Sequence, residues 1–125
     1  SFEEFLLELA DSERDVRRQH RIQRALRASN LPLEKTLETF DRKRLPRKVD
    51  AHVNVLCEGS FLDRCENILA FGQPGSGKTH LLCAIGLELI HAGRRVLFRR
   101  CDVLVQELLA AKRDLTLPRL LKQWD

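Results

Sequence analysis

The first 30 residues repeat apolar side chains at intervals of three and four, which is the spacing of one helix face. No glycine or proline interrupts this run before Ser29 and Asn30. Leu31-Pro32 follows, and proline disfavours helical geometry in the residue before it. The pattern predicts one long amphipathic helix over residues 1–30. Its apolar positions are Phe2, Phe5, Leu6, Leu9, Val16, Ile22, Ala25 and Leu26.

Residues 31–48 lack periodic apolar spacing and are rich in basic side chains, so we expect a basic linker there. Helical spacing returns from residue 49 to residue 58, and Gly59 is placed to stop that short helix. We take residues 49–125 as the second unit of the chain. The basic residues of the linker are Arg42, Lys43, Arg44, Arg47 and Lys48.

A strand, a glycine-rich turn and a helix follow one another in the middle of the chain. The apolar run Ile68–Phe71 predicts the strand, Gly72–Gly77 the turn, and Leu81–Ala92 an almost wholly apolar helix. A helix that is apolar nearly all round is buried on most sides. Gly86 within it costs about 1 kcal/mol relative to alanine, so we expect close packing against that glycine.

The remaining residues predict a second strand and more helix. Val96–Phe98 forms the strand, Asp102 is placed to cap a helix over Val103–Lys112, and Thr116–Gln123 adds a last turn or two. The order strand, helix, strand, helix indicates an α/β fold, a parallel sheet with flanking helices. Two strands alone would leave one edge unpaired. The helix residues expected to face the core are Leu104, Leu108 and Ala111.

The central turn fits the phosphate-binding pattern G-x-x-x-x-G-K-[ST]. Glycines allow the main chain to curl until several N–H groups point at one anion. The lysine brings positive charge to the terminal phosphates, the threonine offers a hydroxyl to Mg²⁺, and the helix N-terminus adds partial positive charge. A glycine-rich hairpin or helix cap would not explain the strand before the glycines and the helix after them. The implied ligand is a nucleoside triphosphate with its magnesium.

The candidate contacts extend one residue beyond the motif, because His80 follows it directly. Thr79 is also the candidate magnesium ligand. The candidate cofactor-binding residues are Gly72, Gln73, Pro74, Gly75, Ser76, Gly77, Lys78, Thr79 and His80.

The net charge of +4 conceals a segregation of acids and bases along the first helix. Residues 1–13 hold five acids and no base, whereas residues 14–28 hold six arginines against the single Asp15. Such arginines can face the backbone of a nucleic acid, or they can form a solvated face with intrahelical pairs. The basic half has almost no acids to pair with, so both interpretations stay open. The candidate DNA-binding residues are Arg14, Arg17, Arg18, Arg21, Arg24 and Arg27.

The cysteines and the lengths of the apolar runs indicate the cellular compartment in which we expect the protein. The four cysteines form no C-x-x-C pair and lie in apolar or helical segments, which predicts buried free thiols in a reducing cytosol. Apolar runs stay short of the roughly 18 residues of a membrane span, and no signal peptide is visible. We therefore expect a cytoplasmic protein without a membrane partner. The chain has no methionine and stops without a turn after Asp125, so we expect both ends to be cut from a longer protein.

Several stretches together resemble the IstB-like family, the helper ATPases of insertion-sequence transposition. These are relatives of the DnaC helicase loader within the AAA+ class. The loop alone is shared with many ATPases, but the combination is more specific and covers essentially the whole chain. The stretches are residues 1–6, 35–41, 61–69, 72–81, 92–96 and 102–105.

The resemblance implies an ATP-binding, DNA-associated partner of a transposase that assembles as a homo-oligomer in the bacterial cytoplasm. It implies that residues 49–125 are the N-terminal part of a P-loop AAA+ ATPase domain. It also implies that Gly72–Thr79 contact ATP, and that Leu37 and Phe40 lie near the adenine.

The chain departs from the family pattern in its acids. Family members continue beyond the position of Asp125 with an apolar strand ending in paired acids, then a sensor residue and an arginine finger. Hydrolysis requires groups that place the attacking water and stabilise charge on the γ-phosphate. Asp102, Glu107 and Asp114 lie in a predicted cap, a helix and its exit, so no catalytic set is complete. We expect this chain to bind ATP without hydrolysing it.

Two other classes of function remain. A P-loop kinase would share the loop, but no acceptor-binding residue or lid is identifiable. A non-catalytic DNA or protein adaptor would use only the arginine-rich helix.

Overall fold

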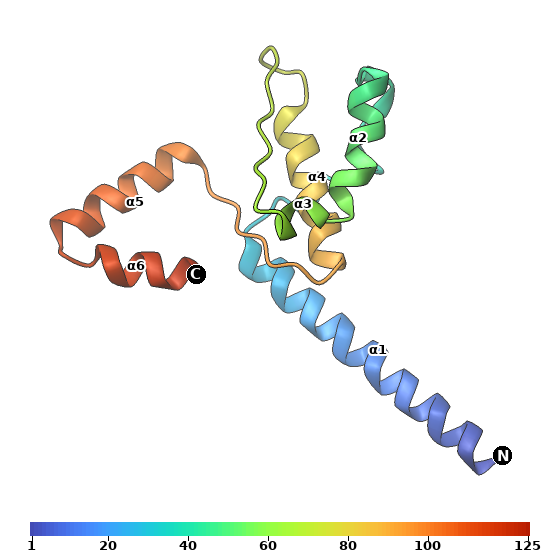
Figure 1. Cartoon of the computed structure of the whole chain (residues 1–125). Helices are drawn as coiled ribbons and strands as arrows, with labels where there is room; N and C mark the ends of the chain where they lie inside the picture. The colour runs from blue at the N-terminus through green and yellow to red at the C-terminus, as the bar shows by residue number, and fades with distance from the viewer.

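Helix α4, Lys78–His91, lies at the centre of the molecule, and the other elements are arranged around it (Figure 1). The structure is a computed structural model that describes residues 1–125. None of its helices combines the length and the apolar character needed to cross a bilayer. The other elements are α1 (Phe2–Ser29), the 3₁₀ turn η1 (Arg42–Arg44), α2 (Arg47–Cys57), α3 (Ser60–Asp63), α5 (Cys101–Arg113) and α6 (Leu117–Trp124).

Helix α1 is a single 28-residue helix that leaves the rest of the molecule over most of its length (Figure 1). The hydroxyl of Ser1 accepts a hydrogen bond from the backbone N–H of Glu4, and the Glu4 carboxylate accepts from the Ser1 amine. This capping box satisfies donors at the helix start. At the other end Asn30 takes a left-handed conformation with φ of 58° and stops the helix.

Two apolar clusters cover opposite sides of α4. The cluster toward α1 contains Leu31, Cys83, Leu87 and Ile90, against which the last turns of α1 pack. The cluster toward α2 contains Val53, Phe61, Ile85 and Leu89. Val96 packs against both clusters. Burial on both sides explains why the sequence of α4 is apolar nearly all round, as predicted.

The close packing predicted at Gly86 is confirmed. A Cβ at this position would lie 3.3 Å from Leu31 Cδ1 and 3.5 Å from Val96 Cγ1. The glycine therefore lets two neighbouring segments approach the backbone of α4, which offsets its unfavourable helix propensity.

The predicted α/β fold with a parallel sheet is wrong, because the chain forms helices and no strand. Ile68–Phe71 and Val96–Phe98 lie outside any ladder of hydrogen bonds. A strand exists only when a neighbouring strand takes up its N–H and C=O groups. Instead, the N–H of Phe98 donates to the carbonyl of Ser29 at the end of α1, at 2.7 Å. The two short apolar runs therefore predicted strands, but neither run has a neighbouring strand to pair with.

Helices α5 and α6 pack on each other to one side of the α4 body (Figure 1). The prediction that Leu104, Leu108 and Ala111 face the core is confirmed for Ala111, which is buried, whereas Leu104 and Leu108 are half-buried. None of the three belongs to the clusters around α4. Asp102 does not cap α5 from outside, because the helix already begins at Cys101. Its carboxylate accepts from the N–H of Val103 and from Arg100 instead.

The cysteines are free, but only some are buried as predicted. Cys83 is buried and Cys57 is half-buried, and burial raises the pKa of both thiols. Cys65 and Cys101 are exposed, because they lie in a turn and at a helix start rather than in the core. The expectation of four buried thiols is wrong for these two.

Candidate nucleotide-binding site

The phosphate loop begins with a tight turn. The N–H of Ser76 donates to the carbonyl of Gln73 at 3.2 Å, closing a four-residue turn. Pro74 occupies its second position and Gly75, with φ of 78°, its third. Proline followed by a residue with positive φ is the signature of a type II turn. The sequence Gln-Pro-Gly-Ser therefore fixes the direction in which the loop leaves residue 73.

Gly77 connects this turn to α4 and needs to be glycine for two reasons. Its φ of 88° lies in the left-handed region, where a side chain strains the backbone. A Cβ would also lie 2.9 Å from Cε2 of Phe40, which packs directly against the loop. The linker residue Phe40 is thus part of the wall of this site.

The first turn of α4 presents backbone donors to the loop. No side chain caps the helix, and the N–H of Leu81 bonds the carbonyl of Gly77 at 2.9 Å. The N–H groups before Leu81 have no partner one turn back within the helix. These donors and the partial positive charge of the helix end favour an anion at this position.

The ammonium of Lys78 lies inside the curl of the loop. Its Nζ donates to the carbonyls of Gly72 and Gln73 at 2.8 and 2.7 Å, and lies 3.4 Å from Oγ of Ser76. A phosphate oxygen would offer the same donor a charged acceptor, and charge-assisted hydrogen bonds are the stronger ones. The lysine is therefore positioned to exchange loop carbonyls for phosphate.

The side chain of His80 contacts the linker. Its Nε2 lies 3.0 Å from the carbonyl oxygen of Thr36 and 3.1 Å from Oγ1 of Thr39. A carbonyl oxygen can only accept, so Nε2 carries the proton in this arrangement. The imidazole thus holds the linker on α4.

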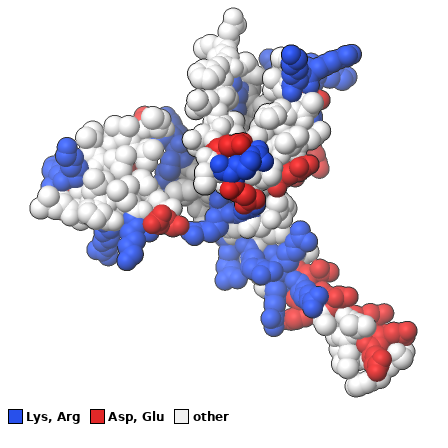
Figure 2. Space-filling model, viewed as in Figure 1, with Lys and Arg blue, Asp and Glu red and all other residues white.

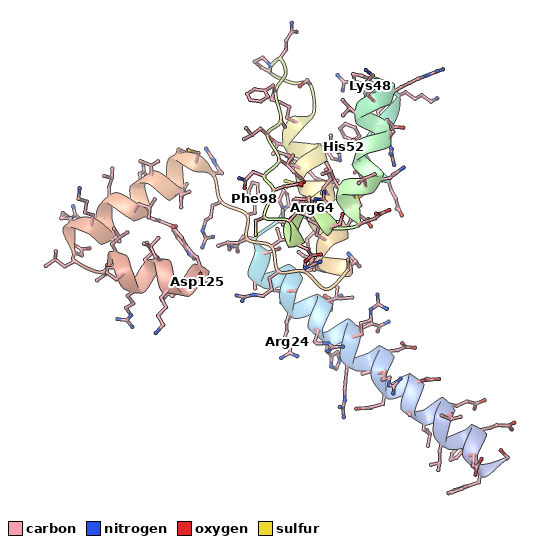
Figure 3. The ribbon with its side chains drawn as sticks, in the orientation of Figure 1. Arg24, Lys48, His52, Arg64, Phe98 and Asp125 are labelled. Carbon is pink, nitrogen blue, oxygen red and sulfur yellow. The ribbon has the colours of Figure 1, made fainter.

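An open cavity of about 590 Å³ lies beside the loop, between α2, residues 68–72 and α4. Its walls are mainly apolar, with Phe40 among them. Its charged and titratable lining residues are all basic, and no carboxylate reaches it. The basic lining residues are Arg44, Lys48, His52 and Lys78. Figure 3 shows two of them, Lys48 and His52, on α2, the helix that forms one wall.

The sequence did not predict that Lys48 and His52 of α2 line the site. It assigned Lys48 to the basic linker only. A signal was available, since Lys48 and His52 are four residues apart and so share one helix face. Of the two linker residues suggested by resemblance, only Phe40 lines the cavity. Leu37 packs into the cluster on the α2 side of α4.

Thr79 is the only predicted metal ligand, and it is the exposed residue of the first turn of α4. No group of three or more His, Cys, Asp or Glu side chains could hold a metal ion. Mg²⁺ commonly takes one or two protein ligands together with substrate phosphates and water. A single hydroxyl beside a phosphate loop fits that mode, whereas a metal cage made only of side chains does not.

The six arginines of α1 are all exposed. Arg17 forms an ion pair with Glu13 at 2.8 Å, and the other five form none. Arg18 and Arg21 line a cavity at the base of the helix. Figure 3 shows Arg24 pointing away from the α2 and α4 body. The arginines of α1 therefore form an inner set, Arg18 and Arg21, which lines this cavity, and an outer set, which does not. The outer set is Arg14, Arg17, Arg24 and Arg27.

Known proteins resemble this chain over its whole described length. A sequence model of the family described as IstB-like ATP binding protein matches residues 1–124. The chain belongs to this family. The IstB-like chain is 44% identical over 122 residues to an insertion sequence ATP-binding protein of Sinorhizobium fredii, covering 97% of the chain and 41% of that protein.

Further relatives carry the same kind of name. The ATP-binding protein of insertion sequence IS21 from Pseudomonas aeruginosa is 39% identical over 126 residues, covering 98% of this IstB-like chain and 46% of that protein. The ATP-binding protein of insertion sequence IS5376 from Geobacillus stearothermophilus is 38% identical over 122 residues, covering 98% and 49%. The IstB-like chain thus spans less than half the length of these relatives.

Proposed function

We propose that this IstB-like chain binds ATP with Mg²⁺ through the loop Gly72–Thr79 and the start of α4. The observation that carries the proposal is the position of Lys78 Nζ inside the loop, bonded only to acceptors that a phosphate can replace. The unpaired backbone donors before Leu81 support it, because they add to the positive potential at the same place. The names of the family and its relatives support ATP as the nucleotide.

The base of the nucleotide would lie in the cavity beside the loop, against Phe40. Binding sites for small molecules are mostly apolar with a few placed polar groups, and 590 Å³ is within their usual size. The basic residues at the rim would attract the triphosphate, since no acid opposes them there. Thr79 would offer its hydroxyl to Mg²⁺, with phosphate oxygens and water as the other ligands.

Binding without hydrolysis is the activity we propose for the chain itself. Hydrolysis needs a group that orients water opposite the γ-phosphate. Neither Asp nor Glu lines the cavity beside Lys78, so no carboxylate can take that part there. Hydrolysis by the longer relatives remains a separate proposal.

The biological role we propose is that of a helper in insertion-sequence transposition that acts on DNA with a transposase, as a cytoplasmic homo-oligomer. The names of the relatives support the transposition context. The exposed arginines of α1 support association with DNA, because five of the six have no ion-pair partner. The likeness to helicase loaders belongs to the same proposal.

Calorimetric titration of ATP at millimolar Mg²⁺ tests the nucleotide site. We expect heat with the native chain and a loss of at least tenfold in affinity for Lys78→Ala, because the ammonium carries the charge inside the loop. Lys122→Ala, on the exposed surface of α6, is the matched control and should bind as the native chain does. Equal binding by the two lysine variants would refute the proposed site.

A DNA adaptor that does not use nucleotide is the second candidate function, supported by the exposed arginines of α1. It differs from the first in one measurable respect. DNA binding by the adaptor would survive Lys78→Ala and would not change with ATP.

A further inference from the structure

A concave basic surface lies at the base of α1, remote from the phosphate loop. It is a cavity of about 470 Å³ between the last turns of α1 and the turn that follows α4. Its floor is apolar, formed by residues including Ile22, Ala25 and Ile90. Its rim carries four arginines from segments about seventy residues apart in the sequence, and no acid lines it. We call this cavity the basal groove, and its arginines are Arg18, Arg21, Arg94 and Arg95.

The four arginines differ in whether they form an ion pair within the chain. Arg94 donates to the carboxylate of Asp63 at 2.8 Å, so part of its charge is already paired. Arg18, Arg21 and Arg95 form no ion pair. Four guanidinium groups around one hollow repel one another, and this repulsion is relieved when an anion binds among them. The surface is therefore suited to a negatively charged ligand.

The extent of the surface favours a polymer over a single ion. A second cavity of about 640 Å³ adjoins the basal groove, since Ala25 and Arg95 line both. It adds Arg99, which forms an ion pair with Glu107 at 3.8 Å, and has one acid, Asp125, among its lining residues. Figure 2 shows basic side chains gathered where α1 meets the rest of the molecule, with acidic ones farther out along α1. A ligand that follows this path must carry negative charge at repeated intervals.

We propose that the basal groove binds the phosphate backbone of a nucleic acid. This inference rests on the proposed DNA association and assigns it to the inner side of α1 together with the turn after α4. Arginine suits the task, because its planar guanidinium pairs with phosphate through two parallel hydrogen bonds. Arg95 becomes a binding residue outside the arginine-rich helix, while Arg24 and Arg27, which do not line the groove, contribute less.

Fluorescence anisotropy of labelled duplex DNA, measured at several salt concentrations, tests the proposal with single charge reversals. We expect Arg18→Glu and Arg95→Glu each to weaken binding about tenfold or more. The slope of log K against log salt should fall by about 0.9 for each phosphate of duplex DNA that the variant no longer neutralises. Arg119→Glu, on the exposed side of α6, is the matched control for net charge and should change both quantities least. Arg94→Gln avoids placing a second acid beside Asp63 and should weaken binding without unfolding the chain.

The outcomes separate the groove from the wider proposal. Arg95→Glu behaving as Arg119→Glu, while Arg24→Glu weakens binding, would overturn the groove and leave DNA association by the outer side of α1. Failure of the native chain to bind any DNA would overturn DNA association itself. Equal affinity for polyglutamate of matched charge would overturn the assignment to nucleic acid in favour of an acidic protein partner.

Discussion

Phe40 stands edge-on to His80, with ring centroids 5.2 Å apart and ring planes inclined by 72°. The two residues are forty positions apart, one in the linker and one in the first turn of α4. Phe40 also packs against Gly77, so the same ring contacts the phosphate loop and the helix that follows it. The linker is therefore a structural part of the candidate nucleotide site and does more than join two units.

Replacing His80 by alanine should loosen this attachment. The variant loses the hydrogen bonds of Nε2 with Thr36 and Thr39 and the edge-on packing against Phe40. We expect a fall of about 1 to 2 kcal/mol in the free energy of unfolding, measured by urea titration. His20→Ala, on the exposed part of α1, should change the free energy of unfolding very little. An unchanged midpoint for His80→Ala would contradict the role of the imidazole.

Replacing Gly77 by alanine should damage both folding and nucleotide binding. The new methyl group strains a backbone with φ of 88° and collides with Phe40. Strain alone costs about 1 to 2 kcal/mol at a left-handed residue. Gly93→Ala is the matched control, because Gly93 has φ of 90° but nothing within 4 Å of an added Cβ. We expect thermal and urea unfolding to rank Gly77→Ala as the less stable variant.

A second change tests whether the collision with Phe40 causes the extra loss. Adding Phe40→Leu to the Gly77→Ala variant removes the clashing ring atoms and should recover part of the stability. Adding Phe40→Leu to Gly93→Ala should recover none. The same recovery in both backgrounds would show that the ring and the loop are independent.

Truncating Ile90 should create a cavity on the α1 side of α4. The side chain is 1% exposed and packs with Leu31, Cys83 and Leu87. Buried Ile→Ala changes cost about 2 to 5 kcal/mol, which is a large part of the stability of a small domain. Val16→Ala, on the free part of α1, should cost less than about 0.5 kcal/mol in the same unfolding measurement. Similar costs at the two positions would contradict the burial of Ile90 in the cluster between α1 and α4.

Acid should weaken the contact between α3 and the turn after α4. Arg94 donates a hydrogen bond to Asp63 and holds the pKa of that carboxyl below its ordinary value of 3.8. A carboxyl with a lowered pKa in the folded state adds stability above the ordinary pKa, and this is lost as the pH falls through the folded value. Asp63→Asn should therefore show a smaller loss of stability below pH 3.8 than the native chain. Asp11→Asn, in the exposed acidic part of α1, provides the comparison.

The sequence predicted the helices better than it predicted which segments pair with each other as strands. Helical spacing and the glycine at residue 86 depend on neighbours a few positions away or on burial of a whole face, and the structure has both the helices and the close packing. The two strands depended on segments finding each other in space, which no local pattern specifies. Leu69 and Phe71 are 77% and 88% exposed, so their apolar character did not imply burial.

The candidate site shows the same division. The turn at Pro74 and Gly75 follows directly from the residue types, because proline and glycine restrict or permit particular φ values. The contact of His80 with Thr36 could not be inferred, since it joins residues 44 positions apart. The inner set of arginines on α1 was equally hidden, because only the packing of the last turns of α1 decides which ones border the groove.

Helix α4 starts in the phosphate loop at Lys78 and finishes beside the basal groove at His91. Its 14 residues form a rod about 20 Å long, held on both flanks by apolar contacts. A helix packed along both flanks is expected to shift largely as one body, so that a displacement at one end reaches the other. The regions proposed to bind triphosphate and nucleic acid therefore lie at opposite ends of the same helix, which offers a structural route by which binding at one could influence the other.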